Sequence, residues 1–302
     1  MKRYAAIDLG TNTFHMIIVE KDNKGEINVI NRSRHFVKLA YGGFKNIDDE
    51  AIARGIDVLT EFKSLLKKYK VDKYLAFGTS MFRRSSNGIE FSKRLEEKTG
   101  IKINIIDGNL EAKLIFNGAK LAGALRPGYN LIMDIGGGSV EFIISDTKDI
   151  VFKKSYPIGI IELYHKFKHL EPFNKNTIGN ILEYIKSNAP ELQKEISKYN
   201  ISTLIGTAGS FEVLHTIKLK NINDHLFDIS PDDFNLFFES VAYTTHEERL
   251  KTDSIPKERK RLIVYAFLLI KFSLKISLAP IIRVTSYSMK EGMINELINE
   301  KD

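Results

Sequence analysis

The sequence predicts an α/β protein of two similar lobes, on the basis of an internal repeat, the chain length and a central break. One pattern occurs twice: an apolar strand ending in Asp, a small-residue turn, a second strand, a polar turn and a third strand. The 302 residues suffice for two cores of roughly 100 to 150 residues each. Arg126-Pro127-Gly128 interrupts a helical pattern just before the second copy. We therefore expect lobes at 1–125 and 126–302.

The two copies each predict a three-stranded antiparallel meander. The first is YAAIDLGTNTFHMIIVEKDNKGEINVI at 4–30, and the second is YNLIMDIGGGSVEFIISDTKDIVFKKS at 129–155. Asp134 and Gly136 take the places of Asp8 and Gly10, 126 residues (134 minus 8) further along the chain. The two turns therefore stand at equivalent points of the repeat.

The segments after each meander also correspond. Each copy continues through a Gly-containing loop and a helical pattern to a strand that ends in Gly and Thr, at 73–80 and 202–210. Asp48 is a suitable N-cap for the first helix, and Ser230-Pro231 provides an N-cap and an N1 proline for another. A last helix at about 289–302 is expected to pack back on the first lobe.

Charge and composition narrow the chemistry without naming it. Lys and Arg number 45 against 38 Asp and Glu, so the net charge of +7 favours anionic partners. The absence of Cys excludes a disulfide framework, a thiolate metal site and a Cys nucleophile. On charge alone, nucleic acid, phosphate polymers, nucleotides and membrane surfaces all remain open.

Hydropathy argues against a membrane protein. The longest apolar run, Leu262 to Ile270, has nine residues, whereas a spanning helix needs about 20. The N-terminal segment reaches Asp8 before an apolar run of signal-peptide length can form. We expect a soluble cytoplasmic protein with no membrane partner.

The two Asp-bearing turns predict a phosphate and metal site. Glycine lets backbone amides approach an anion closely. The carboxylates of Asp8 and Asp134 would repel a bare phosphate, so they favour a bridging hard cation, Mg²⁺ or Mn²⁺. A single such turn is more often an ordinary hairpin, but two in a repeat favour the functional interpretation.

Two other strand-end residues have open interpretations. Glu111 is either a functional carboxylate or a solvated residue in the first turn of a helix at 109–124. Arg83 is either a ligand contact or half of a surface salt bridge. Spacing alone does not choose between these alternatives.

Seven segments together resemble, in order, the motifs of the exopolyphosphatase and guanosine pentaphosphate phosphohydrolase family. They are IDLGTNTFHMIIVE (7–20), GTSMFRRSSNG (78–88), IIDGNLEAKLIFNGA (105–119), LIMDIGGGSVEFII (131–144), YPIGIIEL (156–163), LIGTAGS (204–210) and SYSMKEG (286–292). The resemblance runs almost end to end and is to the short, two-domain form.

The resemblance implies two ribonuclease-H-like lobes of the actin-like ATPase superfamily with an interlobe active-site cleft. It implies a metal-dependent hydrolase that releases terminal phosphate from inorganic polyphosphate, from guanosine pentaphosphate (pppGpp), or from both. No nucleic acid polymer is expected as a partner. Because dimers are common in the family, a homodimer is among the implied partners.

The resemblance also assigns roles to residues. Arg83 matches a substrate-binding arginine, Glu111 a water-activating carboxylate and Glu141 a second active-site carboxylate. The implied metal ligands are Asp134 and Asp8. The implied phosphate-binding residues are Gly10, Thr11, Asn12, Thr13, Gly136, Gly137, Gly138, Ser139, Gly209 and Ser210.

Some positions depart from the family pattern and bear on substrate length and nucleotide acceptance. Leu110 stands where many members carry an acidic residue, and Ser288 and Lys290 replace a usual Gly and Arg. The stretch 259–270 lacks the small residue often found in the corresponding helix, and Tyr265 is expected to narrow whatever lies there. The basic run Lys257 to Arg261 is either an approach path for a polyanion or a solvated helix face.

Two alternatives to the hydrolase stay open. A sugar or acyl kinase of the same superfamily shares both phosphate loops, but it requires an acceptor pocket that the sequence does not identify. An actin-like or chaperone-like assembly protein gated by ATP would carry insertions, for which two lean lobes leave little room.

Overall fold

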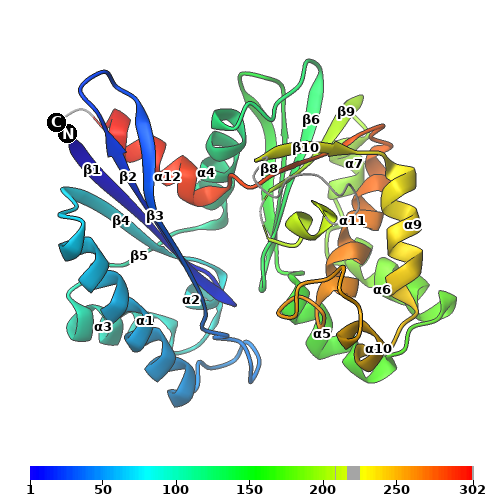
Figure 1. The fold of residues 1–302 in the computed structure, drawn as a ribbon. Helices are drawn as coiled ribbons and strands as arrows, with labels where there is room; N and C mark the ends of the chain where they lie inside the picture. The colour runs from blue at the N-terminus through cyan, green and yellow to red at the C-terminus, as the bar shows by residue number, and fades with distance from the viewer. Residues whose placement is uncertain (208, 216–224, 301–302) are drawn as a thin grey trace. The chain divides into compact units, whose positions relative to one another are not determined.

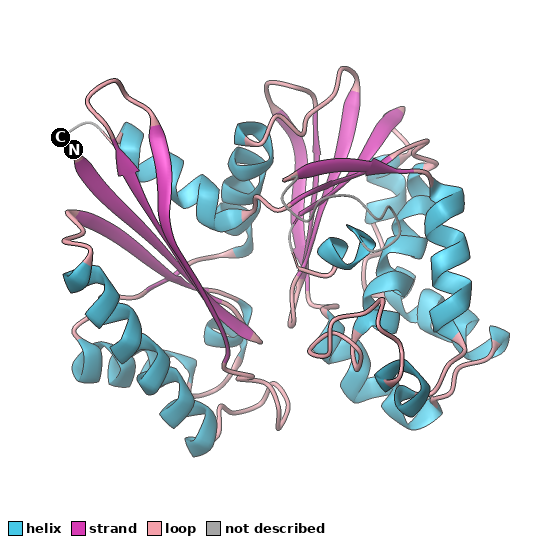
Figure 2. Cartoon of the chain, viewed as in Figure 1, coloured by secondary structure: helices cyan, strands magenta, loops and turns pink. Residues whose placement is uncertain are grey.

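The computed structural model describes residues 1–207, 209–215 and 225–300, and the chain forms two compact units. Unit 1 contains Met1–Gly118 and Met289–Asp302, and unit 2 contains Ala119–Ser288. The predicted division at 125/126 lies a few residues after the observed boundary between Gly118 and Ala119. Figure 2 shows that each unit combines one sheet (magenta) with flanking helices (cyan).

Unit 1 is built on a five-stranded sheet in the order β3-β2-β1-β4-β5. Strands β1, β2 and β3 are antiparallel, and β4 and β5 continue from β1 in parallel. The predicted first meander is therefore confirmed. The strands are β1 (Lys2–Leu9), β2 (Thr13–Lys21), β3 (Ile27–Phe36), β4 (Lys73–Gly78) and β5 (Asn104–Ile105).

Helices cover both faces of this sheet. Figure 1 shows α1 and α3 on one face and α12 (red) on the other, where α12 contacts β1, β2 and β4. The predicted cap of α1 is confirmed, because the Asp48 side chain accepts a hydrogen bond from the Ala51 amide at 2.7 Å. The helices are α1 (Asp49–Lys68), α2 (Ser80–Arg84), α3 (Gly88–Thr99), α4 (Gly108–Leu121) and α12 (Met289–Asn299). Residues 301 and 302 of the predicted last helix lie outside the described residues.

Unit 2 repeats this topology in a six-stranded sheet, in the order β10-β11-β9-β6-β7-β8. Strands β6, β7 and β8 form the second predicted meander, and β9 and β11 follow β6 in parallel, as β4 and β5 follow β1. The predicted repeat therefore holds in three dimensions. The strands are β6 (Tyr129–Ile135), β7 (Val140–Ser145), β8 (Ile150–Tyr156), β9 (Ile201–Thr207), β10 (Leu226–Ile229) and β11 (Ile282–Thr285).

The apolar run found in the sequence forms a buried helix of unit 2. Its residues from Ile263 to Ile270 all belong to α11 and are at most 1% exposed. Helix α11 packs against β9 and against α5, α6, α7 and α9. The Ser230 cap of α9 is confirmed by its hydrogen bond from the Asp233 amide at 3.0 Å. The helices are α5 (Ile160–Phe167), η1 (Lys168–Leu170), α6 (Lys175–Ser187), α7 (Leu192–Ile196), η2 (Phe211–Leu214), α9 (Pro231–Ala242), α10 (His246–Leu250) and α11 (Ile263–Ser277).

None of the helices in the described part of the chain is long and apolar enough to cross a bilayer. Helix α11 is apolar because it is buried against β9, α5, α6, α7 and α9.

Tyr265, noted in the sequence as a departure, belongs to a buried network in unit 2. Its hydroxyl donates to Glu171 at 2.9 Å, and Arg249, also buried, contacts the other oxygen of that carboxylate at 2.7 Å. Tyr164 and Phe173 pack edge-on against the Tyr265 ring. Tyr265 is thus a core residue that ties α11 to the segment before α6.

We expect Tyr265→Phe to lower the free energy of unfolding by about 1 to 2 kcal/mol at neutral pH, because Glu171 loses a hydrogen-bond donor. Burial, with the nearby Glu171 carboxylate, raises the pKa of Tyr265 above the ordinary tyrosine value. The unfolded chain therefore ionises first, and this stability is present below pH of about 10 and lost as the pH rises further. Denaturant titrations at pH 7 and pH 10.5 should show the difference between wild type and variant shrinking; a constant difference would contradict the network's role.

Candidate active site

The candidate residues of unit 1 lie at the carboxyl ends of its three parallel strands. In the sheet, Leu9 of β1 pairs with Gly78 of β4, which pairs with Ile105 of β5. The segments that follow these strand ends carry the predicted loop at 10–13, then Arg83, then Glu111. Strand register thus gathers residues that are far apart in the sequence, at the edge where ligands bind in open α/β sheets.

The first turn is closed by a hydrogen bond from the Gly10 amide to the Thr13 carbonyl at 3.1 Å. The carbonyls of Thr11 and Asn12 accept hydrogen bonds from the amides of Leu39 and Lys38, at 2.9 and 3.0 Å. These hydrogen bonds occupy the carbonyl groups of Thr11 and Asn12. The backbone amides of the turn are the groups that suit an anion. Asp8, two residues before Gly10, pairs in register with His15 of β2.

Arg83 and Glu111 form an ion pair at this edge. Arg83 Nη1 donates to Glu111 Oε2 at 2.8 Å and to the Ile106 carbonyl at 2.7 Å. The Glu111 side chain is 10% exposed and the Arg83 side chain 22% exposed. Of the two open interpretations, a solvated Glu111 is therefore wrong, and the Arg83 salt bridge exists but is partly buried and made with Glu111.

The local sequence explains where Glu111 stands. Asp107 follows β5 and its side chain accepts a hydrogen bond from the Leu110 amide at 2.7 Å, which orders the start of α4. Glu111 lies in the first turn of that helix, and its amide donates to the Asp107 carbonyl at 3.1 Å. Leu110, which replaces an acidic residue of the family pattern, is 37% exposed.

The second turn, in unit 2, has the same construction. The Gly136 amide donates to the Ser139 carbonyl at 2.9 Å. The carbonyls of Gly136 and Gly137 accept from the amides of Ile160 and Ile161 at the start of α5, at 3.1 and 2.9 Å. A Cβ on Gly159 would lie 2.4 Å from the Gly137 oxygen, so this close packing requires glycine.

A row of polar side chains crosses the sheet beside this turn. Strand pairing places Glu141 of β7 opposite Asp134 of β6, and Thr207 of β9 on the other side of Asp134. Thr207 Oγ1 donates to Asp134 Oδ2 at 2.7 Å, and Ser155 Oγ donates to Glu141 Oε1 at 2.7 Å. Glu141 is 2% exposed, whereas the neighbouring Asp134 is half-buried.

The donor set fits a magnesium ion better than an all-protein metal cage. Among the described residues, no three His, Asp or Glu side chains gather as a metal-binding group. Mg²⁺ is usually held by one or two carboxylates together with water and substrate phosphates. Asp134, oriented by Thr207, and the adjacent Glu141 supply such a partial set.

The predicted third loop lies against the end of β6. Gly209 has a φ of +54°, and a Cβ added there would be 3.8 Å from the Ile135 carbonyl oxygen and 4.0 Å from Arg259 Nη1. Ser210 is 2% exposed, and residue 208 of this motif lies outside the described residues. Arg259 is therefore a neighbour of the glycine-rich loops of unit 2.

The expectation that the basic run at 257–261 lies on a helix is wrong. Residues 257–262 form turns, and α11 begins only at Ile263. Lys260 is buried, and its Nζ donates to the Leu250 carbonyl at 2.9 Å. Arg259 lies 3.9 Å from Glu212 with a side chain that is 16% exposed. The sequence indicated the run but not which member approaches a loop.

Sequence reasoning missed the roles of Thr207 and Ser155. Thr207 lies in the motif LIGTAGS (204–210), but its contact with Asp134 depends on the pairing of β6 with β9. Ser155 pairs with Glu141 through the register of β7 and β8. The structure thus presents two sets of candidate residues, one in each unit. Unit 1 contains the turn at 10–13, Arg83 and Glu111. Unit 2 contains the turn at 136–139, Asp134 and Glu141.

Two α/β units with corresponding sheets and a glycine turn after the first strand of each define a two-lobe α/β protein. The Ppx/GppA phosphatase family model matches residues 17–301, so the chain belongs to this family.

Similar proteins agree with this membership. The crystal structure of an exopolyphosphatase from Cytophaga hutchinsonii is 31% identical, with a TM-score of 0.94, and the match covers 100% of this chain and 99% of that one. The Ppx/GppA family member of Aquifex aeolicus, 22% identical with a TM-score of 0.83 and with 100% and 99% covered, shows the same fold. A guanosine-5'-triphosphate,3'-diphosphate pyrophosphatase of Aliivibrio fischeri is 30% identical over 297 residues, which are 97% of this chain and 58% of that protein.

Proposed function

We propose that this family phosphatase is a metal-dependent phosphoanhydride hydrolase that releases terminal phosphate from inorganic polyphosphate, from pppGpp, or from both. The observation that carries the proposal is the partly buried Arg83–Glu111 pair, 2.8 Å between Nη1 and Oε2, next to a glycine turn built for an anion. The exopolyphosphatase of C. hutchinsonii and the pyrophosphatase of A. fischeri name the two substrate classes.

Arg83 is suited to hold a phosphate oxygen while it positions Glu111. Its two hydrogen bonds described above both use Nη1, and a guanidinium carries five N–H donors. Donors on Nε and Nη2 can therefore serve an anion without breaking the Glu111 contact. A phosphate held there lies next to the carboxylate that orients and deprotonates the attacking water.

The turn residues supply backbone donors to the phosphate chain. Phosphoryl transfer requires little covalent chemistry from the protein, so positioning and charge neutralisation dominate. In our proposal the Gly10 and Gly136 amides close the two turns, and the amides of 11–13 and 137–139 hold phosphate oxygens. Ser210 and Arg259 add donors beside the second turn. Glu141 would act as a second carboxylate of the site.

Asp134 and Asp8 are the proposed metal-binding residues. A bound Mg²⁺ would neutralise charge on the phosphate oxygens. Thr207 keeps the Asp134 carboxylate in one orientation through its 2.7 Å hydrogen bond. The expected interlobe cleft stays a prediction.

A comparison of substrates tests the proposal. Phosphate release is measured from long-chain polyphosphate, tripolyphosphate, pppGpp and ATP, each with Mg²⁺ and with excess chelator. We expect Mg²⁺-dependent release from at least one of the first three. Activity that survives the chelator would remove the metal role, and ADP formation that depends on an added sugar or acyl acceptor would identify a kinase.

A further inference from the structure

One buried hydroxyl of unit 1 has no hydrogen-bond partner within the protein. Among the residues that the structure describes, Ser80 Oγ is the only buried side-chain polar atom of this unit without such a partner. Ser80 as a whole is 3% exposed. Buried polar groups in proteins are nearly always paired, because an unpaired one costs stability. The Ser80 hydroxyl therefore has a hydrogen bond to offer that the folded chain does not use.

Ser80 lies directly beside the first glycine turn. Gly78, at the end of β4, pairs with Leu9, at the end of β1. The next amide, that of Thr79, donates to the Leu9 carbonyl at 3.3 Å. Gly10 and Ser80 are thus the residues that follow in two neighbouring parallel segments. Ser80 belongs to the edge of the sheet where the amides of 11–13 are proposed to hold phosphate.

Ser80 also shares a side of helix α2 with Arg83. The helix begins at Ser80, and Arg83 is three residues further on, a spacing that makes two residues neighbours on a helix surface. The Arg83 amide donates to the Thr79 carbonyl at 3.2 Å, which closes the turn between them. Arg83 Nη1 contacts Glu111 and the Ile106 carbonyl. An anion held by the other donors of Arg83 therefore lies near Ser80.

The packing of α2 explains why the free protein does not pair this hydroxyl. A Cβ on Gly78 would lie 2.7 Å from the Phe82 ring, and a Cβ on Gly88 would lie 2.2 Å from the Phe82 carbonyl oxygen. The helix is thus packed closely against the segments before and after it. It has little freedom to shift and bring Ser80 to a protein acceptor.

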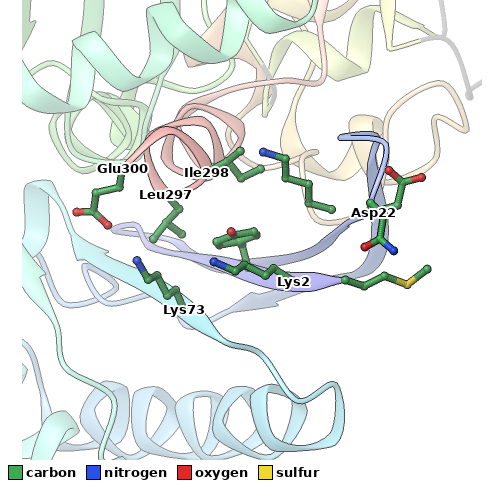
Figure 3. A pocket seen from close by; sticks show the side chains of 10 residues that line it. Lys2, Asp22, Lys73, Leu297, Ile298 and Glu300 are labelled. Atoms are coloured by element: carbon green, nitrogen blue, oxygen red, sulfur yellow. The ribbon is translucent and has the colours of Figure 1, made fainter. Parts of the chain in front are cut away.

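The cavity shown in Figure 3 does not supply the missing partner. It has a volume of about 490 Å³ and lies where β1 and β4 begin, with Lys2 and Lys73 among its lining side chains. Ser80 follows the opposite end of β4 and is not a lining residue. A molecule in that cavity would leave the Ser80 hydroxyl unpaired, whereas a phosphate at the first turn lies at the same edge of the sheet as Ser80.

We propose that Ser80 is a further phosphate-binding residue of unit 1, whose hydroxyl donates a hydrogen bond to an oxygen of the phosphate held by Arg83 and the first turn. A serine hydroxyl moves between three staggered positions about χ1, so it can turn to the anion without a shift of the backbone. Binding then pairs a group that is unpaired in the free protein. The inference rests on the proposed function for the phosphate ligand, but not on its hydrolysis.

Ser80→Ala should affect stability and binding in different ways. Because the hydroxyl is unpaired, the melting temperature of the ligand-free protein should stay the same or rise by about 2 °C. Calorimetric titration with tripolyphosphate in excess chelator should show an affinity about 10- to 100-fold lower, the range for a hydrogen bond to a charged group. A purely structural hydroxyl would give the reverse: a lower melting temperature and an unchanged affinity of the folded protein.

Two further variants serve as controls. Ser145 is also buried with an unpaired Oγ, and it pairs with Asn130 at the end of the unit 2 sheet away from the second turn. Ser145→Ala should therefore keep the affinity of wild type. Ser80→Cys fills nearly the same space with a weak donor, so it should bind tripolyphosphate almost as weakly as Ser80→Ala does.

The outcomes separate the role of Ser80 from the proposed activity. Unchanged affinity in Ser80→Ala, wild-type affinity in Ser80→Cys, or an equal loss in Ser145→Ala would each overturn the role of Ser80. A wild-type protein that binds no tripolyphosphate would overturn it as well. Binding that depends on Ser80, in a protein that releases no phosphate from any substrate, would overturn only the proposed hydrolysis.

Discussion

Glu111→Gln is expected to lower phosphate release by about 10²- to 10⁴-fold, the range for loss of a positioned general base. In the wild-type protein, Arg83 Nη1 donates to Glu111 Oε2 at 2.8 Å. The glutamine amide is nearly isosteric with the carboxylate, so its oxygen can still accept this hydrogen bond. It cannot accept a proton from water. The first turn and the guanidinium remain, and polyphosphate binding should therefore be largely retained. Initial rates with Mg²⁺ and tripolyphosphate, together with equilibrium binding, measure both quantities.

The control for this prediction is Glu97→Gln, which removes the same charge from an exposed position on α3 of the same unit. Thermal melts of both variants show whether any loss of activity comes from unfolding. Near-normal turnover in a folded Glu111→Gln protein would contradict the assignment of Glu111 as the water-activating carboxylate.

Gly292→Ala is expected to disturb both stability and turnover, although residue 292 carries no reactive group. Gly292 of α12 packs directly on the backbone of α4, where an added Cβ would lie 2.0 Å from the Leu114 oxygen and 2.8 Å from its carbonyl carbon. Neither helix backbone can yield locally at that distance, so one of the helices must shift. Leu114 lies three residues after Glu111 on α4 and so shares its side of the helix. A shift of α4 would therefore change the position of the Glu111 carboxylate relative to Arg83.

The expected losses of stability and of rate in Gly292→Ala follow from these contacts. Overpacking typically costs about 1 to 3 kcal/mol of stability, and a displacement of about 1 Å at a reacting group can cost 100-fold in rate. Melting temperature, tripolyphosphate affinity and initial rate are measured on the purified variant. A loss of rate larger than the loss of affinity would show that Gly292 acts by positioning Glu111.

Gly179→Ala is the matched control. Gly179 lies in α6 of unit 2, and an added Cβ would meet nothing within 4 Å. Alanine favours a helix interior over glycine by about 0.5 to 1 kcal/mol, so this variant should be as stable as wild type or more stable. If Gly292→Ala behaved in the same way, the close approach of α12 and α4 would have no functional weight.

Local sequence signals predicted the elements of this protein well. Alternating apolar residues and small-residue turns specify both meanders because a strand exposes its two faces in alternation. Asp48 and Ser230 mark helix starts because an N-cap side chain needs only the amides of the next three residues. Such signals act over a few residues and can be read without knowing the fold.

Interpretations that depended on distant partners were less secure. One of the two interpretations of the basic run at 257–261 was a solvated helix face, yet Lys260 is buried and its Nζ donates to the Leu250 carbonyl, ten residues earlier. Tyr265 stood out as a departure from the family pattern, yet its hydroxyl donates a hydrogen bond to Glu171, 94 residues away. Neither partner follows from the residues around the position itself.

The sequence by itself determined the repeat, the two Asp-bearing glycine turns and the membership that the motif order implied. Only the tertiary structure decided that Glu111 is paired with Arg83, 28 residues earlier, and that Thr207 orients Asp134 across 73 residues. It also decided that the Ser80 hydroxyl is buried with no hydrogen-bond partner among the described residues. The physical reason is strand register: a shift of one residue turns a side chain to the other face of its sheet, so these contacts exist only once the pairing of strands is fixed.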